Sequence, residues 1–194
     1  MYIIFEGVDT CGKSTQVELF AQKHNNIVTT KEPGGTKVGQ KFREILLESD
    51  EKLSPNAELL LFLADRAEHY ASVVKPALKN NIVISDRGLI SGIAYALANH
   101  PTLDKDFLLH VNKFALDDNL PDKVVLFKTN HKLITQRLGD KEKDTIEKRG
   151  IDYLLHVQDL MKDTLDSLHV EYIEVNSEDT IEEIYKQIKE FIYG

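Results

Sequence analysis

The stretch Gly7-Val8-Asp9-Thr10-Cys11-Gly12-Lys13-Ser14, which runs on into Thr15, decides how the rest of the chain is interpreted. It has the spacing G-x-x-x-x-G-K-S, which is typical of a phosphate-binding loop. A short apolar, β-prone run at residues 2–5 precedes it, and residues 15–23 are predicted to form a helix. We therefore expect backbone N–H groups at the start of that helix to surround an anion, because glycine lets the chain wrap closely around it.

Two side chains of this loop have predicted roles of their own. Lys13 is expected to reach the β- and γ-phosphates of a nucleotide, and Ser14 is expected to offer its hydroxyl to Mg²⁺. The alternative is a glycine-rich turn that carries a surface lysine. The alternative is the weaker interpretation, because the pattern lies at a predicted strand-to-helix junction.

Length and composition restrict the class of protein. The chain has 194 residues, of which 42% are hydrophobic and 29% are charged, and its formal net charge is −8. These values predict one compact domain over residues 1–194. The acidic charge argues against polynucleotide binding, and no apolar run reaches membrane-spanning length. A single cysteine excludes an internal disulfide, and the strand at the very start leaves no room for a secretory signal, so we expect a cytoplasmic protein.

Strand and helix patterns alternate along the chain. Further β-prone runs lie at residues 27–30, 82–85, 124–127 and 170–175. A long helix is predicted from Ser54-Pro55 to about Lys79, because serine is a good N-cap and proline is favoured at the first helical position. Such alternation predicts an α/β fold of three layers, in which helices flank a five-stranded parallel sheet.

The residues that directly follow the strands are informative, because ligands of parallel sheets bind beyond the carboxyl ends of the strands. The segment Lys31-Glu32-Pro33-Gly34-Gly35-Thr36 follows the second predicted strand, and Asp86 and Arg87 follow the third. Asp86 could hold Mg²⁺ or could cap the next helix, and the upstream loop favours the metal. Arg87 offers a bidentate fork to phosphate oxygens, with a surface ion pair as the alternative.

Two pairs of residues at helical spacing are candidates for nucleotide recognition. Phe62 and Arg66 are four residues apart, so both lie on one face of the long predicted helix. An aromatic ring beside a guanidinium group could stack on a nucleobase and bind its edge, although core packing is the alternative for Phe62. Ser91 and Tyr95 repeat this spacing on the next helix, where a tyrosine is ordinarily a half-buried packing residue.

The segment from Arg137 to Arg149 is rich in charge and lacks the apolar stripe of a core helix. Such a pattern is ordinarily typical of a solvated helix face or a loop. Close to a phosphate site, a segment of about residues 137–150 could instead be a lid that closes over the nucleotide and brings positive charge to the transferring group.

Together these segments resemble the thymidylate kinase family, the bacterial dTMP kinases among the nucleoside-monophosphate kinases. The similarity covers nearly the whole chain and is carried by residues 5–15, 30–36, 61–66 and 85–87, together with Ser91 and Tyr95. Many families share the phosphate-binding loop. The Glu-Pro-Gly-Gly-Thr segment and the Phe-x-x-x-Arg helix make the resemblance specific.

The resemblance implies transfer of the γ-phosphoryl group of Mg·ATP to dTMP, giving dTDP and ADP for dTTP biosynthesis. It implies an ATP site formed by Gly7, Val8, Asp9, Thr10, Cys11, Gly12, Lys13, Ser14, Thr15 and Arg137. The adenine would lie by Arg137 and the turn Val175-Asn176-Ser177. It also implies a metal site formed by Ser14 and Asp86.

The acceptor site that the resemblance implies consists of Asp9, Arg43, Phe62, Arg66, Arg87, Ser91 and Tyr95. Asp9 would bind the 3′-hydroxyl of the sugar, Phe62 would stack on thymine, and Arg66 would donate to the carbonyl edge of the base. Arg43 and Arg87 would clamp the acceptor phosphate. Ser91 would lie near the base, and Tyr95 would crowd the 2′ position of the sugar.

The chain departs from the family pattern in one respect. Positions 8–11 of the loop carry no basic residue, and members of that kind carry a lid arginine in a pattern similar to Asp-Arg-x-Glu. This chain has Asp144-Thr145-Ile146-Glu147 there. We expect Lys143 to replace the missing arginine, with Lys141 and Arg149 as alternatives, so the predicted catalytic set is Lys13, Arg87 and Lys143.

The resemblance also implies a homodimer that forms through helices flanking the sheet. Three other functions remain open at this point: another nucleotide kinase of the same fold, a nucleotide-dependent switch protein, or a relative that binds nucleotide without efficient transfer. The segment Asn130-His131-Lys132 lacks the Asn-Lys-x-Asp pattern with which GTPases read guanine.

Overall fold

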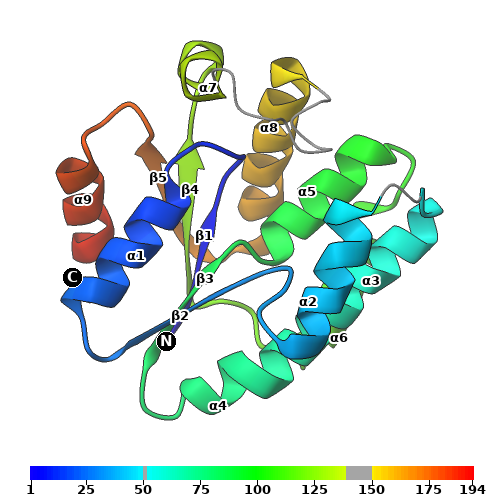
Figure 1. Ribbon diagram of the computed structural model, residues 1–194, viewed down its shortest axis with the longest axis horizontal. Helices are drawn as coiled ribbons and strands as arrows, with labels where there is room; N and C mark the ends of the chain where they lie inside the picture. Colours follow the sequence, from blue (N-terminus) through cyan, green and yellow to red (C-terminus); the bar gives the residue numbers. More distant parts are fainter. Residues whose placement is uncertain (50–51, 139–149) are drawn as a thin grey trace.

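The computed structural model describes residues 1–49, 52–138 and 150–194, and in these residues five parallel strands form one central sheet (Figure 1). The order of the strands is β2-β3-β1-β4-β5. Their bounds are β1 (Tyr2–Glu6), β2 (Ile27–Lys31), β3 (Ile82–Asp86), β4 (Lys123–Lys128) and β5 (Glu171–Asn176). Each strand coincides with a run predicted from the sequence, so the α/β fold is confirmed.

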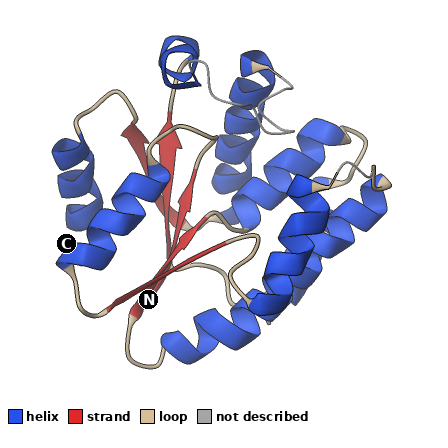
Figure 2. Cartoon of the chain, viewed as in Figure 1, coloured by secondary structure: helices blue, strands red, loops and turns tan. Residues whose placement is uncertain are grey.

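Helices cover both faces of the sheet, as the blue ribbons on either side of the red strands show in Figure 2. The helices α1 and α9 lie on one face, and α5 and α8 lie on the other. The helices are α1 (Lys13–Lys23), α2 (Lys37–Arg43), α3 (Pro55–His69), α4 (Lys75–Ala77), α5 (Leu89–Asn99), α6 (Lys105–Ala115), α7 (His131–Leu138), α8 (Ile151–Leu168) and α9 (Ile181–Tyr193), with short π-helical turns η1 (Glu44–Glu48) and η2 (Tyr70–Val74).

The central strand β1 contributes side chains to both hydrophobic cores. Successive side chains of a strand point to opposite faces, so Ile4 joins the core under α5 and α8, while Ile3 and Phe5 join the core under α1 and α9. All five residues of β1 are buried. This double burial explains why residues 2–5 of the strand form a continuous apolar run in the sequence instead of an alternating one.

The long helix predicted from residue 54 is present, with two differences. Its course is divided into α3, η2 and α4, and the last of these ends at Ala77. Pro55 takes the first helical position as expected, but the side chain of Ser54 makes no capping hydrogen bond. None of the described helices is long and apolar enough to cross a membrane.

Candidate active site

The phosphate-binding loop joins β1 to α1 and is shaped by two glycines. Gly7 and Gly12 have φ angles of 149° and 98°, which disfavour residues with a side chain. A Cβ at Gly7 would lie 2.8 Å from the carbonyl oxygen of Phe127. Helix α1 begins directly after Gly12, so its unpaired N–H groups and its positive dipole end face the loop.

Lys13 carries its positive charge into this loop. Its Nζ atom donates hydrogen bonds to the carbonyl oxygens of Gly7 and Val8, at 2.9 and 3.0 Å. The side chains of Val8 and Cys11 are buried in the two hydrophobic cores, so at these positions the backbone is the part that can meet a phosphate. The ammonium group therefore lies at the loop to which an anion is predicted to bind.

Ser14 and Asp86 lie together, as predicted for a metal site. The Ser14 hydroxyl donates to Oδ2 of Asp86 at 2.8 Å, and Asp86 is the last residue of β3. The N-cap of the following helix is Gly88, so Asp86 does not have the alternative capping role. In the described part of the chain no group of three or more His, Cys, Asp or Glu residues could hold a metal. A hydroxyl and one carboxylate still fit Mg²⁺, which takes its other ligands from water and phosphates.

Arg87 connects the loop to the start of α5. It donates through Nη1 to the carbonyl oxygen of Gly7 at 2.7 Å and to Oγ of Ser91 at 3.2 Å, and through Nη2 to Oδ1 of Asp9 at 2.6 Å. Its φ of 71° is uncommon for a residue other than glycine. Strained backbone of this kind is often found at functional sites, where the surrounding structure maintains it.

The carboxyl group of Asp9 is held in its charged form. Burial alone would raise its pKa, but the positive charges of Arg87 and Lys13 outweigh burial and lower the pKa. An ionised carboxylate is a hydrogen-bond acceptor only. Asp9 can therefore accept from a ligand hydroxyl, as the predicted contact with a sugar requires.

Glu6 is a buried residue of the site that sequence reasoning missed. It accepts hydrogen bonds from the backbone N–H of Ser91, at 3.2 Å, and from the hydroxyl of Ser91. Burial raises the pKa of its carboxyl group. The one available signal was an acidic residue at the end of an otherwise apolar strand.

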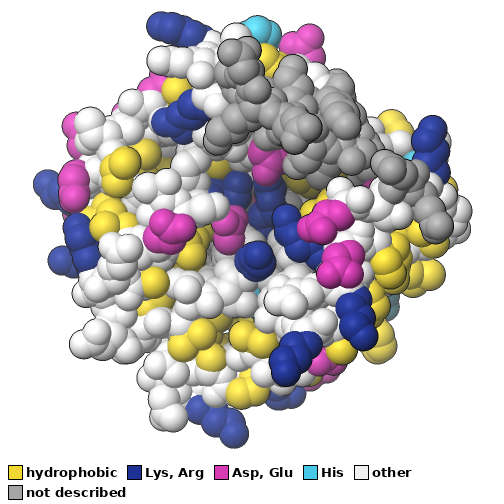
Figure 3. Space-filling view, in the orientation of Figure 1, with side chains coloured by type: hydrophobic (Ala, Val, Ile, Leu, Met, Phe, Trp, Pro, Cys, Tyr) yellow, Lys and Arg dark blue, Asp and Glu magenta, His cyan; other side chains and the backbone are white. Residues whose placement is uncertain are grey.

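A cavity of about 530 Å³ adjoins the loop. All seven residues predicted to bind dTMP line it, and they come from five separate parts of the chain: Asp9, Arg43, Phe62, Arg66, Arg87, Ser91 and Tyr95. Figure 3 shows Lys and Arg side chains, in dark blue, gathered in a hollow in this face. The cavity and the loop share a wall, since Arg87 and Lys13 donate to the same carbonyl oxygen of Gly7.

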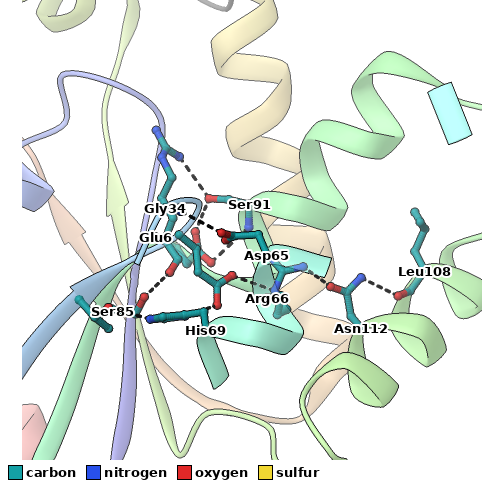
Figure 4. Close-up of polar contacts among 12 residues, drawn as sticks. Glu6, Gly34, Asp65, Arg66, His69, Ser85, Ser91, Leu108 and Asn112 are labelled. Carbon is teal, nitrogen blue, oxygen red and sulfur yellow. Dashed lines mark hydrogen bonds and ion pairs between the residues drawn. The ribbon is translucent and has the colours of Figure 1, made fainter. Parts of the chain in front are cut away.

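Arg66 lies at the cavity, but protein groups already hold much of its guanidinium. Its Nε atom donates to Oε2 of Glu32 at 2.9 Å, and Nη1 donates to Oδ1 of Asn112 (Figure 4). Only 3% of the residue is exposed. Donation from Arg66 to a base therefore stays a prediction, and Glu32 and Asn112 are neighbours to which the sequence had assigned no role.

Arg137 connects the phosphate-binding loop to the turn that is predicted to lie by the adenine. Its Nη1 donates to the carbonyl oxygen of Thr10 at 2.9 Å, and its Nη2 donates to that of Ser177 at 2.8 Å. The guanidinium thus bridges the phosphate-binding loop and the turn after β5. The lid predicted at residues 137–150 lies mostly outside the described residues, and so do Lys143, its alternatives Lys141 and Arg149, and Thr145.

A phosphate-binding loop that shares a wall with an arginine-lined cavity is the arrangement expected of a P-loop kinase, which holds a nucleoside triphosphate beside its acceptor. The family model described as thymidylate kinase matches residues 5–188. The chain therefore belongs to the thymidylate kinase family, and the resemblance inferred from the motifs is confirmed.

Individual proteins of this family are similar to the chain over its whole length. The thymidylate kinase of Sulfurovum sp. (strain NBC37-1) is 54% identical over 192 residues, which is 99% of each chain. That of Campylobacter concisus is 50% identical over 193 residues, 99% of this chain and 98% of the relative. The crystal structure of thymidylate kinase from Ehrlichia chaffeensis has a TM-score of 0.79 and 26% sequence identity, over 100% of this chain and 98% of that one.

Proposed function

We propose that the chain transfers the γ-phosphoryl group of ATP to the 5′-phosphate of dTMP, giving ADP and dTDP. The observation that carries this proposal is the cavity beside the phosphate-binding loop, which is lined by every residue predicted to bind dTMP. A lone nucleotide-binding loop would suit many proteins. A second anion site within reach of the first suits transfer between two phosphates.

The loop and Arg137 would bind ATP. The N–H groups at the start of α1 and the Lys13 ammonium would meet its phosphates, and the adenine would lie near the turn that Arg137 contacts at Ser177. In the transfer, an oxygen of the dTMP phosphate bonds to the γ-phosphorus while the bond to the bridging oxygen of ADP breaks. The acceptor oxygen is already ionised, so no general base is required.

The cavity would hold dTMP with its phosphate toward the loop. Arg43 and Arg87 would clamp that phosphate, Asp9 would accept from the sugar hydroxyl, and Phe62 would stack on the thymine ring. The protein's contribution is to align two anions that repel one another in water, and to offset the charge that develops between them.

Ser14 and Asp86 would hold Mg²⁺, directly or through water. When bound, the ion supplies positive charge that offsets the charge of the transferring group. The Asp86→Asn variant is expected to need about tenfold more Mg²⁺ for half-maximal rate, because a neutral amide binds the ion less strongly than a carboxylate does. A titration curve identical to that of the wild type would contradict this assignment.

The direct experiment is a panel of nucleoside monophosphates in a coupled assay of ADP release. The proposal expects dTMP to give the highest kcat/KM, with dUMP, dCMP and dGMP below it. A different kinase of the same fold would prefer another monophosphate. A switch protein would hydrolyse its nucleotide slowly at a rate that no monophosphate changes, and either result would overturn the proposal.

We also propose that two copies associate in the cytoplasm, where ATP is available, through the outer faces of α3 and α6. Large apolar side chains are exposed there: Phe114 at 81%, Leu60 at 64% and Phe107 at 52%. Phe107 and Phe114 are seven residues apart, so they lie on one face of α6. Light scattering should give the mass of a dimer for the wild type and of a monomer for Phe114→Glu, and a monomeric wild type would refute this proposal.

A further inference from the structure

We propose that Glu32, His69 and Asn112 are positioning residues that fix the guanidinium of Arg66 for recognition of the base. The inference rests on the proposed function, because it concerns how the acceptor nucleotide is selected. Glu32 and Asn112 touch Arg66, and His69 touches Glu32. None of the three needs to touch the nucleotide.

Within residues 1–49, 52–138 and 150–194, groups from different elements hold the guanidinium of Arg66 at two of its three nitrogen atoms. Glu32, in the loop after β2, accepts from Nε at 2.9 Å, and Asn112, on α6, accepts from Nη1. Asn112 is itself held, because its amide nitrogen donates to the carbonyl oxygen of Leu108 at 2.7 Å (Figure 4). Two anchored acceptors fix both the position and the plane of a guanidinium, whose donors form a rigid fork.

The third nitrogen, Nη2, lies beside Gly92 on α5, which also lines the cavity. A Cβ at position 92 would lie 2.9 Å from Nη2 and 3.1 Å from Nη1, closer than a side chain can approach without displacing the guanidinium. The absence of a side chain at Gly92 therefore leaves room for Arg66 at the wall of the cavity. We infer that Nη2 is the group that Arg66 offers to the base.

Glu32 is in turn held by His69. The Nδ1 atom of His69 donates to Oε1 of Glu32 at 2.8 Å, and its Nε2 atom is 2.7 Å from Oγ1 of Thr30 in β2. Burial alone would raise the pKa of Glu32, but Arg66 and His69 outweigh burial and lower it. Glu32 therefore stays ionised, and the buried charge of Arg66 keeps a charged partner.

The loop that carries Glu32 also contacts the arginine predicted to bind the acceptor phosphate. The carbonyl oxygen of Pro33 accepts from Nη1 of Arg43 at 3.2 Å, and the N–H of Gly34 donates to Asp65 at 3.0 Å. One short segment thus touches Arg66 at the base end of the cavity and Arg43 at the phosphate end. It can set the separation between the two.

A fixed Arg66 would discriminate between pyrimidines. Its nitrogen atoms only donate hydrogen bonds, so it suits the carbonyl oxygen that thymine presents at the position where cytosine presents an amino group. If Arg66 could rotate away from the base, it would no longer face the amino group of cytosine. The site would then lose its discrimination between the two bases. The positioning residues should therefore affect the choice of base and the KM for dTMP, and should leave the KM for ATP unchanged.

The test compares the Glu32→Gln variant with the wild type. Glutamine keeps the shape of the side chain but removes its charge, and we expect the KM for dTMP to rise about tenfold while the ratio of kcat/KM for dTMP over dCMP falls. Thr164→Val is the matched control, because among the described residues this buried hydroxyl donates within α8, to the carbonyl oxygen of Leu160. It should change neither quantity.

Paired substitutions keep the test decisive if Glu32→Gln does not fold. Asn112→Leu should raise the KM for dTMP and Asn112→Asp, which keeps an acceptor oxygen, should restore it. His69→Asn, whose amide nitrogen can replace Nδ1, should likewise retain more dTMP selectivity than His69→Ala. Folded variants with the wild-type KM for dTMP and the wild-type base ratio would overturn the inference, and so would equal increases in KM for both substrates. A wild type that does not phosphorylate dTMP would instead overturn the proposed function.

Discussion

The phosphate end and the base end of the site are built in different ways. The phosphate end consists mainly of backbone groups and side chains from one continuous stretch, residues 7–15, with Asp86 and Arg87 added at the neighbouring strand. The base end consists of side chains from α3, α5 and α6 and the loop after β2, joined by buried hydrogen bonds. Contiguous motifs make the first visible in a sequence, whereas only the fold assembles the second.

The difference also separates two chemical tasks. Binding any phosphate needs N–H groups, a positive charge and little else. Choosing one base needs donors that are fixed in space, and fixing them requires further residues behind them. Variants at the phosphate end should therefore change turnover, whereas variants at the base end should change the choice of substrate.

The largest effect is expected at the phosphate end. Lys13→Ala should lower kcat about a thousandfold, because it removes a preorganised charge from the transferring phosphoryl group. The measurement is the steady-state rate of ADP formation at saturating substrates, with circular dichroism to show that the variant folds. A folded variant with near-wild-type turnover would remove Lys13 from the mechanism.

A smaller effect is expected for the aromatic wall of the base end. Phe62→Ala should raise the KM for dTMP about tenfold or more, because stacking on a base contributes roughly 1–3 kcal/mol. The KM for ATP should stay as it is. The control is Phe191→Ala, which removes a ring that packs on the other face of the sheet. If both variants change the KM for dTMP equally, Phe62 is a packing residue only.

A third effect concerns the stability of the fold at the base end, not the reaction. Burial raises the pKa of Asp65 to about 6, so between about pH 4 and 6 the folded state binds more protons than the unfolded state. Stability therefore falls as the pH rises through this range. Asp65→Asn keeps an acceptor for the N–H of Gly34 and should be more stable than the wild type at pH 7, by at most about 3 kcal/mol.

At pH 4 the two proteins should have nearly the same free energy of unfolding, measured by urea denaturation. An exposed aspartate on α8, Asp159, provides the comparison, because Asp159→Asn should leave stability unchanged at both pH values. The opposite result is a variant that equals the wild type in stability at pH 4 and is less stable than the wild type at pH 7. That result would show that the negative charge itself stabilises the fold.

The sequence predicted the five strands, the loop, the Ser14–Asp86 pair and the seven residues at the cavity. These follow from β-branched runs, from fixed glycine spacing, and from a pattern shared across a family. The polar partners behind them were missed. Glu32 belongs to the Glu-Pro-Gly-Gly-Thr segment, but the sequence assigned it no role of its own. His69 follows Arg66 by three residues on one helix face. Asn112 belongs to a helix that carries no motif. Their partners are distant in the chain, so spacing alone could not reveal them.

We infer that dTMP is selected at the cavity beside the phosphate-binding loop, and that the loop itself performs the transfer. Calorimetric titration of dTMP into the wild type, Lys13→Ala and Arg66→Ala tests it most directly. We expect Arg66→Ala to bind dTMP about tenfold or more weakly, and Lys13→Ala to bind it with nearly wild-type affinity. Normal dTMP binding by Arg66→Ala, together with lost binding by Lys13→Ala, would contradict it.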